Sequence, residues 1–260
     1  MKQSYFWPFY GDQGEIVFLF SASRSRQLLD SALETFKGTI LCDGYGAYES
    51  FSLKVAPDRV ELAQCWVHCR RKFIEAEKQN PKYATPVLNL IAKLYEIESQ
   101  LREASPETRL ARRQTHSAPI VAEIINHVNQ IICREPLVPS DLFVKAAKYL
   151  LKRKSELSLY LTNPDLPMDT NHIERQIRSV AIGRKNWMFC FTEVGAHISG
   201  ILYSLIASCR LADVDPYDYL VDVLQRISIH PISDVHLLTP KLWKVHFQHQ
   251  LLTSNAFCSE

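Results

Sequence analysis

The chain has little glycine, and none lies between Tyr83 and Leu161. Only eight of the 260 residues are glycine. Glycine is the residue that most often ends helices and forms tight turns, so a long stretch without it favours helix. Apolar residues recur there at three- and four-residue intervals, and strand signals are almost absent. We therefore expect residues 76–165 to form an α-helical insertion.

An excess of one charge, long apolar runs and a regular cysteine framework are also lacking. The 30 basic residues nearly balance the 28 acidic ones, and a net charge of +2 does not by itself indicate a nucleic-acid partner. No stretch approaches the roughly 20 apolar residues that span a membrane, and the N-terminus lacks the apolar core of a signal peptide. The seven cysteines are scattered, which favours reduced thiols. These absences predict a globular cytoplasmic protein without a membrane partner.

Basic residues are nevertheless clustered locally. The runs are Arg70-Arg71-Lys72, Arg112-Arg113, Lys152-Arg153-Lys154 and Arg184-Lys185. Each run has two interpretations that stay open: a solvated helix face, or a contact with nucleic acid.

The first 75 residues are typical of an α/β unit. The aromatic and β-branched segments "SYFWPFY" and "IVFLF" flank the turn "GDQGE", which predicts an antiparallel hairpin. The segment "SRQLLDSALETFKG" predicts a helix that ends at Gly38. The segments "TILCD" and "VELAQCW" predict buried strands, and the second leads into the helix "HCRRKFIEAEK". Later helices are expected to start at Ser105 and Asp215, each followed by proline.

Asp43 follows the predicted strand "TILCD" and precedes Gly44 and Gly46. Its carboxylate is therefore expected at the carboxyl edge of a sheet, where α/β proteins place ligand-binding groups. A turn-forming aspartate before glycine explains the same pattern.

Glu174 lies within "NHIERQIRSVAIGRKNWMF", a helix start rich in cations. Asn171 and Glu174 have the spacing of a capping box, so Glu174 has a purely structural interpretation. However, Arg178 is four residues further on and therefore on the same helix face. A carboxylate that coordinates a divalent cation, flanked by phosphate-binding cations, suits phosphoryl transfer on nucleic acid. Trp187 and Phe189 offer either stacking surface for a base or core packing.

Taken together, the stretches "LCDGYGAYE", "CWVHCRRKF", "NHIERQIRSVAIGRKNWMF" and "ISGILYSLIASCRLADVDPYDYLVDVLQRI" resemble transposases of the insertion sequence 66 family. These are Asp-Asp-Glu recombinases of prokaryotic mobile elements. The resemblance implies an α/β fold, namely an incomplete ribonuclease-H-like mixed sheet with a large α-helical insertion and a helical C-terminal part. Residues 1–75 would begin the ribonuclease-H-like domain, 76–165 form the insertion, 166–231 complete the catalytic domain, and 232–260 form a tail.

The resemblance also implies roles for individual residues. Asp43 is the second catalytic acid and Glu174 the third, and both are metal ligands for Mg²⁺ or Mn²⁺, with two ions expected in an intact member. DNA, as element ends and target, is the implied partner. The implied DNA-binding residues are His68, Arg70, Arg71, Asn171, Arg175, Arg178, Arg184, Lys185, Asn186 and Trp187. Where the family commonly has Asp-Asn-Asn, this chain has Asp169-Thr170-Asn171.

One departure from the family pattern concerns the first catalytic aspartate, which precedes the hairpin in the family. The chain starts at Met1 without it, and neither Asp12 nor Asp30 is placed to replace it. Two metal ions about 3.5–4 Å apart need a bridging carboxylate. Its loss is expected to leave weak or absent metal binding and to slow catalysis roughly a thousandfold or more. The missing strand would also expose a sheet edge, which favours pairing with another copy or with full-length transposase.

Cys65, His68 and Cys69 also have a spacing that suggests zinc, but a closed structural site needs four ligands and no second pair is near. By resemblance, His68 instead helps to orient DNA. Two functions follow. One is a truncated, inactive transposase of metal-dependent DNA cleavage and strand transfer. The alternative is a non-catalytic regulator that binds DNA or an intact transposase.

Overall fold

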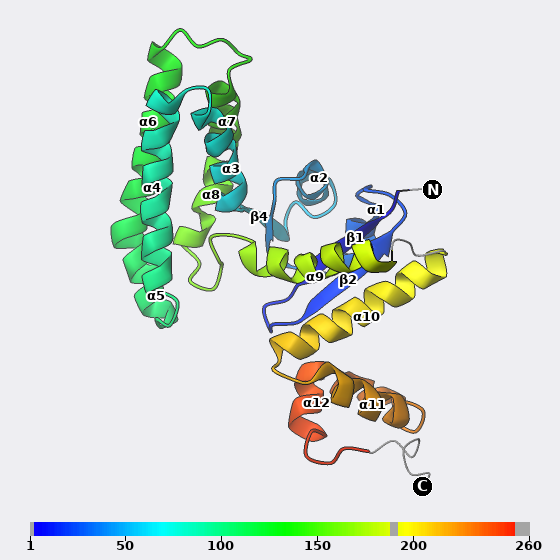
Figure 1. Ribbon diagram of the computed structural model, residues 1–260. Helices are drawn as coiled ribbons and strands as arrows, with labels where there is room; N and C mark the ends of the chain where they lie inside the picture. Colours follow the sequence, from blue (N-terminus) through cyan, green and yellow to red (C-terminus); the bar gives the residue numbers. More distant parts are fainter. Residues whose placement is uncertain (1–2, 188–191, 253–260) are drawn as a thin grey trace. The chain divides into compact units, whose positions relative to one another are not determined.

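The fold is mixed α and β with helices in the majority, over the residues that the computed structural model describes, 3–187 and 192–252. Side chains are described for these residues except 184–187. The chain divides into two units, one of Ser25–His172 and one that combines Met1–Arg24 with Ile173–Glu260. Figure 1 shows their elements, and each unit is described by itself.

The unit Ser25–His172 holds one pair of strands and most of the helices. In chain order it contains α1 (Gln27–Ala32), β3 (Gly38–Cys42), α2 (Gly46–Lys54), β4 (Val60–Gln64), α3 (Trp66–Glu77), α4 (Pro81–Gln100), α5 (Pro106–Arg112), the π-helical η1 (Arg113–Ser117), α6 (Ala118–Arg134), α7 (Leu142–Lys152), α8 (Lys154–Ser158) and the 3₁₀ turn η2 (Leu159–Leu161). The two strands pair in parallel, with Cys42 opposite Gln64.

Two predicted boundaries in this unit are wrong. The helix predicted to end at Gly38 ends at Ala32, because a turn from Leu33 to Phe36 follows it. Gly38 instead begins β3, where its amide donates to the carbonyl of Arg59 at 2.9 Å. The strand predicted over "VELAQCW" ends at Gln64, since the next residues start a helix.

The helical character predicted for residues 76–165 is found, while their role as an insertion into a ribonuclease-H-like domain stays a prediction. Residues 76–165, all of which the structure describes, contain helices and turns and no strand. Figure 1 shows α4 and α6 side by side. Their apolar faces form one core with α3 and α7, built from Phe73, Val87, Ile91, Ile124 and Phe143. This burial stabilises the packing of these helices on one another.

Both proline-marked helix starts are confirmed. The hydroxyl of Ser105 accepts a hydrogen bond from the amide of Thr108 at the start of α5. Asp215 Oδ1 accepts from the amides of Tyr217 and Asp218 at 2.8 and 3.1 Å. Each cap satisfies backbone donors that a helix start otherwise leaves unpaired.

The second unit combines the first residues of the chain with the last third. It contains β1 (Tyr5–Tyr10), β2 (Ile16–Ser21), α9 (Asn171–Trp187) from Ile173 onward, α10 (Glu193–Leu211), α11 (Pro216–Arg226), the 3₁₀ turn η3 (Ile232–Leu238) and α12 (Pro240–His246). The predicted hairpin is confirmed, because β1 and β2 pair antiparallel with Tyr10 opposite Ile16.

Helix α10 packs along β2, as Figure 1 shows. The hydroxyl of Ser204 accepts from the amide of Phe18 at 2.8 Å, and that of Ser208 donates to the carbonyl of Ile16 at 3.2 Å. Gly200 makes the approach possible, since a Cβ there would lie 2.6 Å from the carbonyl oxygen of Phe18. The expectation that no stretch approaches a membrane span is wrong for α10, whose 19 residues are long and apolar enough to cross a membrane by length and composition. Its serine contacts with β2 are those of a helix packed on a sheet.

The segment predicted as a tail contributes to this unit. Leu238 of η3 and Trp243 of α12 are buried with Cys209, Tyr219 and Val223. Within the described residues, four strands pair as two separate two-stranded sheets. The single ribonuclease-H-like sheet therefore stays a prediction, as do the bounds of the four predicted segments.

Candidate active site

Asp43 lies at the edge of the sheet where two parallel strands end. Strand β3 ends at Cys42 and β4 at Gln64, and these residues are paired, so Asp43 emerges directly beyond the edge. It is exposed, and its Oδ1 accepts a hydrogen bond from the amide of Tyr45 at 2.9 Å. Its Oδ2 has no hydrogen-bond partner within the described part of the chain. The expected placement at a strand end is found, and this oxygen is available to a ligand.

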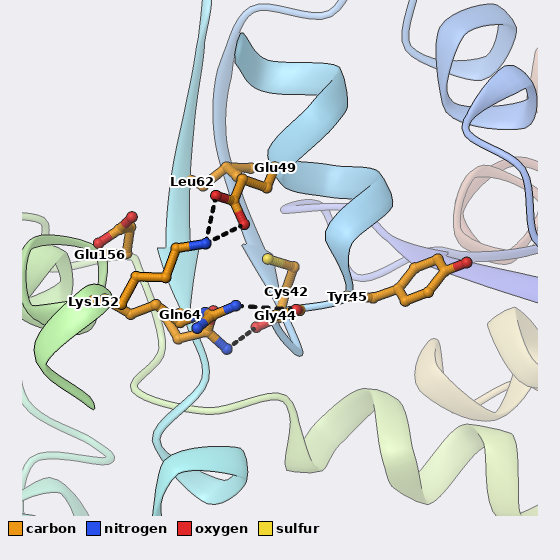
Figure 2. Close-up of a pocket in the computed structure, with 9 residues that line it drawn as sticks. Cys42, Gly44, Tyr45, Glu49, Leu62, Gln64, Lys152 and Glu156 are labelled. Atoms are coloured by element: carbon orange, nitrogen blue, oxygen red, sulfur yellow. Dashed lines mark hydrogen bonds and ion pairs between the residues drawn. The ribbon is translucent and has the colours of Figure 1, made fainter. Parts of the chain in front are cut away.

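A pocket adjoins Asp43 on the same unit. Its lining residues are Cys42, Gly44, Tyr45, Glu49, Leu62, Gln64, Lys152, Arg153 and Glu156. Figure 2 shows Lys152 reaching from α7 to Glu49, which it contacts at 2.8 Å, while the ring of Tyr45 points away from the pocket. The hydrogen bond from Lys152 lowers the pKa of Glu49. Lys152 therefore forms an ion pair with Glu49, so the interpretation as a purely solvated helix face does not describe this residue.

Glu174 occupies the first turn of α9 and is half-buried. The helix begins at Asn171 itself, so Asn171 lies inside the first turn and not ahead of it as expected for a cap. Asp169 Oδ1 accepts from the amide of Asn171 at 2.9 Å, which gives this helix start its own short-range hydrogen bond. Arg175 and Arg178 of the same helix are exposed.

The opposite side of α9 carries the packing contacts. Ile177 and Val180 pack against Ile16 and Phe18 of the hairpin. This contact holds the helix while leaving Arg175 and Arg178 in solvent, where they are accessible to a polyanion.

Asp43 and Glu174 belong to different units. Their sharing of a metal ion therefore stays a prediction. Among the described residues, no group of three or more His, Cys, Asp or Glu side chains is arranged to hold a metal. The donors themselves suit the expected ion, because Mg²⁺ prefers carboxylate oxygens and is bound through one or two carboxylates together with phosphates and water.

The remaining predicted DNA-binding residues lie on α3 and at the end of α9. Arg70 and Arg71 of α3 are exposed, and His68 is half-buried. Arg70 is close enough to Tyr95 to act electrostatically on its hydroxyl. The other predicted contacts lie outside the described side chains: Arg184, Lys185, Asn186, Trp187 and Phe189.

Cys65 links the strand pair to the start of α9. Its sulfur accepts hydrogen bonds from the amide and the hydroxyl of Thr170, at 3.3 and 3.2 Å. Burial acts to raise the pKa of the Cys65 thiol, but the hydrogen bonds from His68 and Thr170 outweigh burial and lower it. Burial instead raises the pKa of Cys42 to about 12. Cys65 is therefore a hydrogen-bond acceptor with a structural task.

Sequence reasoning missed the residues that surround the Asp43 backbone. Gln64, Tyr149 and Arg153 each donate a hydrogen bond to the loop that carries this acid. Tyr149 and Arg153 are more than 100 positions away in the chain. The run Lys152-Arg153-Lys154 was the one available signal. Neither of its two interpretations, a solvated helix face or a nucleic-acid contact, predicts the hydrogen bond from Arg153 to the Gly44 carbonyl.

Two family models cover nearly the whole chain. Residues 1–198, which include both candidate acids, match the model described as "Transposase IS66 family". Residues 204–240 match the model described as "IS66 C-terminal element". The chain belongs to the IS66 family of transposases.

Curated proteins that are similar in sequence to this IS66 family chain include three described as uncharacterized proteins of Sinorhizobium fredii. Protein y4jD is 33% identical over 235 residues, which are 88% of this chain and 46% of the relative. Protein y4hP is 32% identical over 244 residues, 88% of this chain and 44% of the relative. The chain thus spans about half the length of the curated relatives it matches. No solved structure matches it.

Proposed function

We propose that this chain carries part of the catalytic centre of an IS66 family transposase, in which Asp43 and Glu174 hold divalent metal for DNA strand cleavage and strand transfer. One observation carries the proposal. Asp43 is an exposed carboxylate at the carboxyl edge of a parallel strand pair, within the segment that matches the family. A ribonuclease-H-like arrangement, with Asp43 and Glu174 at one centre, is part of the same proposal.

The two acids would act as oxygen ligands. Mg²⁺ or Mn²⁺ bound there activates the attacking oxygen and stabilises the leaving oxygen of a phosphodiester. Asp43 is suited to this by its solvent-facing Oδ2, while the amide of Tyr45 fixes its Oδ1. Glu174 projects from a helix that is anchored by apolar packing at Ile177 and Val180. Anchored ligands keep their geometry when the substrate arrives.

DNA binding is proposed to use cations that flank the acids. Arg175 and Arg178 follow Glu174 on α9, and Arg70 and Arg71 lie on α3; all four are exposed. The guanidinium group of arginine can donate two parallel hydrogen bonds to a phosphate. These side chains would therefore position the backbone of the DNA rather than recognise its sequence. A protein with these tasks acts in the cytoplasm of a prokaryotic cell, where mobile DNA is accessible.

By the family resemblance, this chemistry uses Asp43 and Glu174 together with a first aspartate that precedes the hairpin. We therefore compare residues 1–260 with a version that includes the codons upstream of Met1, which would carry that aspartate if they encode it. The alternative, a non-catalytic regulator of transposition, predicts DNA or transposase binding without cleavage in both versions.

Strand nicking of a supercoiled plasmid that carries the element ends tests the proposal. Both versions are incubated with Mg²⁺ or Mn²⁺, and each is compared with its Asp43→Ala, Glu174→Ala and Asp58→Ala variants. Asp58 is an exposed aspartate ahead of β4 and serves as the matched control. We expect nicking by the extended version, a loss of roughly a thousandfold in the first two variants, and no loss in the third.

Two results would overturn parts of this account. Equal nicking by the Asp43→Ala variant and its parent excludes Asp43 from catalysis. Nicking by the 260-residue chain, abolished by either acid substitution, keeps the proposed chemistry and removes the need for a further aspartate upstream.

A further inference from the structure

Three consecutive carbonyl groups around Asp43 each accept a hydrogen bond from a side chain. Gln64 Nε2 donates to the carbonyl of Cys42 at 3.2 Å, the hydroxyl of Tyr149 donates to that of Asp43 at 3.2 Å, and Arg153 Nη2 donates to that of Gly44 at 3.5 Å. The backbone of the loop is thus tied down, while the Asp43 carboxylate points to solvent. The side-chain hydrogen bonds therefore fix the loop and leave the Asp43 carboxylate for the ligand.

Gln64 and Tyr149 form one continuous network. The second hydrogen of Gln64 Nε2 goes to the hydroxyl of Tyr149, at 2.9 Å, so that this amide group uses both of its donors. The hydroxyl in turn accepts from Gln64 and donates to Asp43. Gln64 is only 5% exposed, which makes an unpaired donor costly and the network specific.

Tyr149 comes from α7, in the helical insertion, and its ring is held in place. Lys72 Nζ lies 4.9 Å from the ring centroid, and the guanidinium of Arg153 lies 4.3 Å from it. Cations at such distances from an aromatic ring are attracted to its face. Burial raises the pKa of Tyr149, which keeps its hydroxyl protonated and able to donate.

The position of Gly44 provides an independent sign of close fit. A Cβ at this residue would lie 2.6 Å from the Tyr149 hydroxyl and 3.0 Å from the Gln64 amide. Its φ of +81° also belongs to the region that favours glycine. The loop is therefore shaped to bring its backbone against the Tyr149 hydroxyl.

We propose that Tyr149 is a positioning residue for Asp43, through which the helical insertion sets the geometry of the catalytic acid. The inference rests on the proposed function and adds to it a role for the insertion. Tyr149 acts through the Asp43 carbonyl, in the way that groups behind a metal ligand orient that ligand.

The test removes one hydroxyl and compares it with another in the same helical region. Tyr149→Phe keeps the ring and loses both hydrogen bonds of the hydroxyl. Tyr83→Phe is the matched control, because the Tyr83 hydroxyl donates to Glu135 at 2.8 Å and makes no contact with the Asp43 loop. Gln64→Met, which removes the two donors at similar length, is the second variant.

The first readout is plasmid nicking by the form that is active in the assay above. For Tyr149→Phe and Gln64→Met we expect the rate to fall about 10-fold to 100-fold, with a higher Mg²⁺ concentration at half-maximal rate. Plasmid affinity should stay near that of the parent, and both variants should remain folded at the assay temperature even though the unpaired Gln64 donor lowers the melting temperature of Tyr149→Phe. A merely structural loss would not combine these results with slower nicking. Parental nicking by Tyr149→Phe, or an equal loss in Tyr83→Phe, overturns the proposal.

The second readout needs no catalysis and uses the 260-residue chain. Hydrogen exchange at the Tyr45 amide reports on the loop, because this amide donates to Asp43 Oδ1. We expect faster exchange in Tyr149→Phe and parental exchange in Tyr83→Phe. Unchanged exchange in Tyr149→Phe overturns the proposal even if no form nicks. Failure of the proposed function is recognised separately, by nicking that survives Asp43→Ala.

Discussion

The sulfur of Cys65 accepts hydrogen bonds from both the amide and the hydroxyl of Thr170, 105 positions further along the chain. Both residues are buried. This pair joins the end of β4 to the segment that leads into α9 and Glu174. A second link runs parallel to it, because the amide of Trp66 donates to the carbonyl of Met168 at 3.2 Å.

Replacement of Cys65 by alanine should therefore destabilise the protein. The amide and hydroxyl of Thr170 would be left as buried donors, at a cost of about 1–3 kcal/mol. Urea unfolding monitored by tryptophan fluorescence measures the change. Cys133→Ala, at an exposed cysteine, is the control and should leave the unfolding free energy unchanged. Equal effects of the two substitutions would remove the assigned role of the Cys65 sulfur.

Arg113 shows that a basic run need not be a surface feature. Its side chain is 3% exposed and pairs with Glu98, with Nη2 to Oε2 at 2.7 Å. Its Nη1 also lies within hydrogen-bond distance of four carbonyls, those of Tyr160, Asn163, Pro164 and Leu166. One arginine thereby pairs with a carboxylate through Nε and Nη2 and donates to a group of backbone acceptors through Nη1.

Arg113→Ala is expected to lower the unfolding free energy by about 3–5 kcal/mol, because it leaves the Glu98 carboxylate partly buried without its partner. The neighbouring Arg112 is exposed, and Arg112→Ala should change the unfolding free energy by less than about 0.5 kcal/mol. Thermal melting of the two variants side by side gives the comparison. A similar melting temperature for both would contradict the ion pair as described.

Glycines 44 and 46 form a matched pair for testing the Asp43 loop. An added Cβ at Gly44 meets the Tyr149 hydroxyl and forces a strained φ, whereas one at Gly46 meets nothing within 4 Å. Gly44→Ala should cost about 1–3 kcal/mol, and Gly46→Ala should be neutral or slightly stabilising. Denaturant unfolding of both variants checks this, and a harmless Gly44→Ala would contradict the close fit of the loop.

Asp222 predicts a pH dependence in the C-terminal helices. It is fully buried, and although burial acts to raise its pKa, hydrogen bonds from Arg226, the Leu252 amide and Trp243 lower it. The unfolded chain, with a pKa of about 3.9, then binds protons at higher pH than the folded chain. The stability contributed by Asp222 is present above about pH 4 and is lost as the pH falls through the folded pKa.

Asp222→Asn should lower the unfolding free energy at pH 7 by about 1.5–3 kcal/mol, the usual contribution of a hydrogen bond to a charged group. The gap between this variant and the parent should narrow as the pH falls below about 4. Urea unfolding at several pH values measures it, with the exposed Asp218→Asn on the same helix as control. A gap that is constant with pH would show that the Asp222 charge does not contribute.

Local chemistry made part of this fold predictable. The hairpin and the caps at Ser105 and Asp215 depend on residues that are neighbours in the chain, so short motifs identify them. The hydrogen bonds from Tyr149 and Arg153 to the Asp43 loop depend on tertiary packing between residues more than 100 positions apart, and no local pattern marks them. Gly38 illustrates the same limit. Its type suggests a helix end, but its amide donates to the Arg59 carbonyl and it pairs with Val60, so it starts a strand.

The candidate acids were found from motifs, but their joint geometry was not. Asp43 was located by the strand and glycine pattern, and Glu174 by the cations and the family resemblance around it. The two acids belong to different units, Ser25–His172 and the unit of Met1–Arg24 with Ile173–Glu260, and spacing in the sequence does not encode whether they share one ion.

The most direct test of that sharing is a Mn²⁺ titration by electron paramagnetic resonance, made on the version extended upstream of Met1 and on its Asp43→Ala, Glu174→Ala and double variants. If both carboxylates bind one ion, each single substitution weakens the same site, and the double variant binds no more weakly than the weaker single variant. Additive losses, or no loss in either single variant, would contradict a shared metal centre at Asp43 and Glu174.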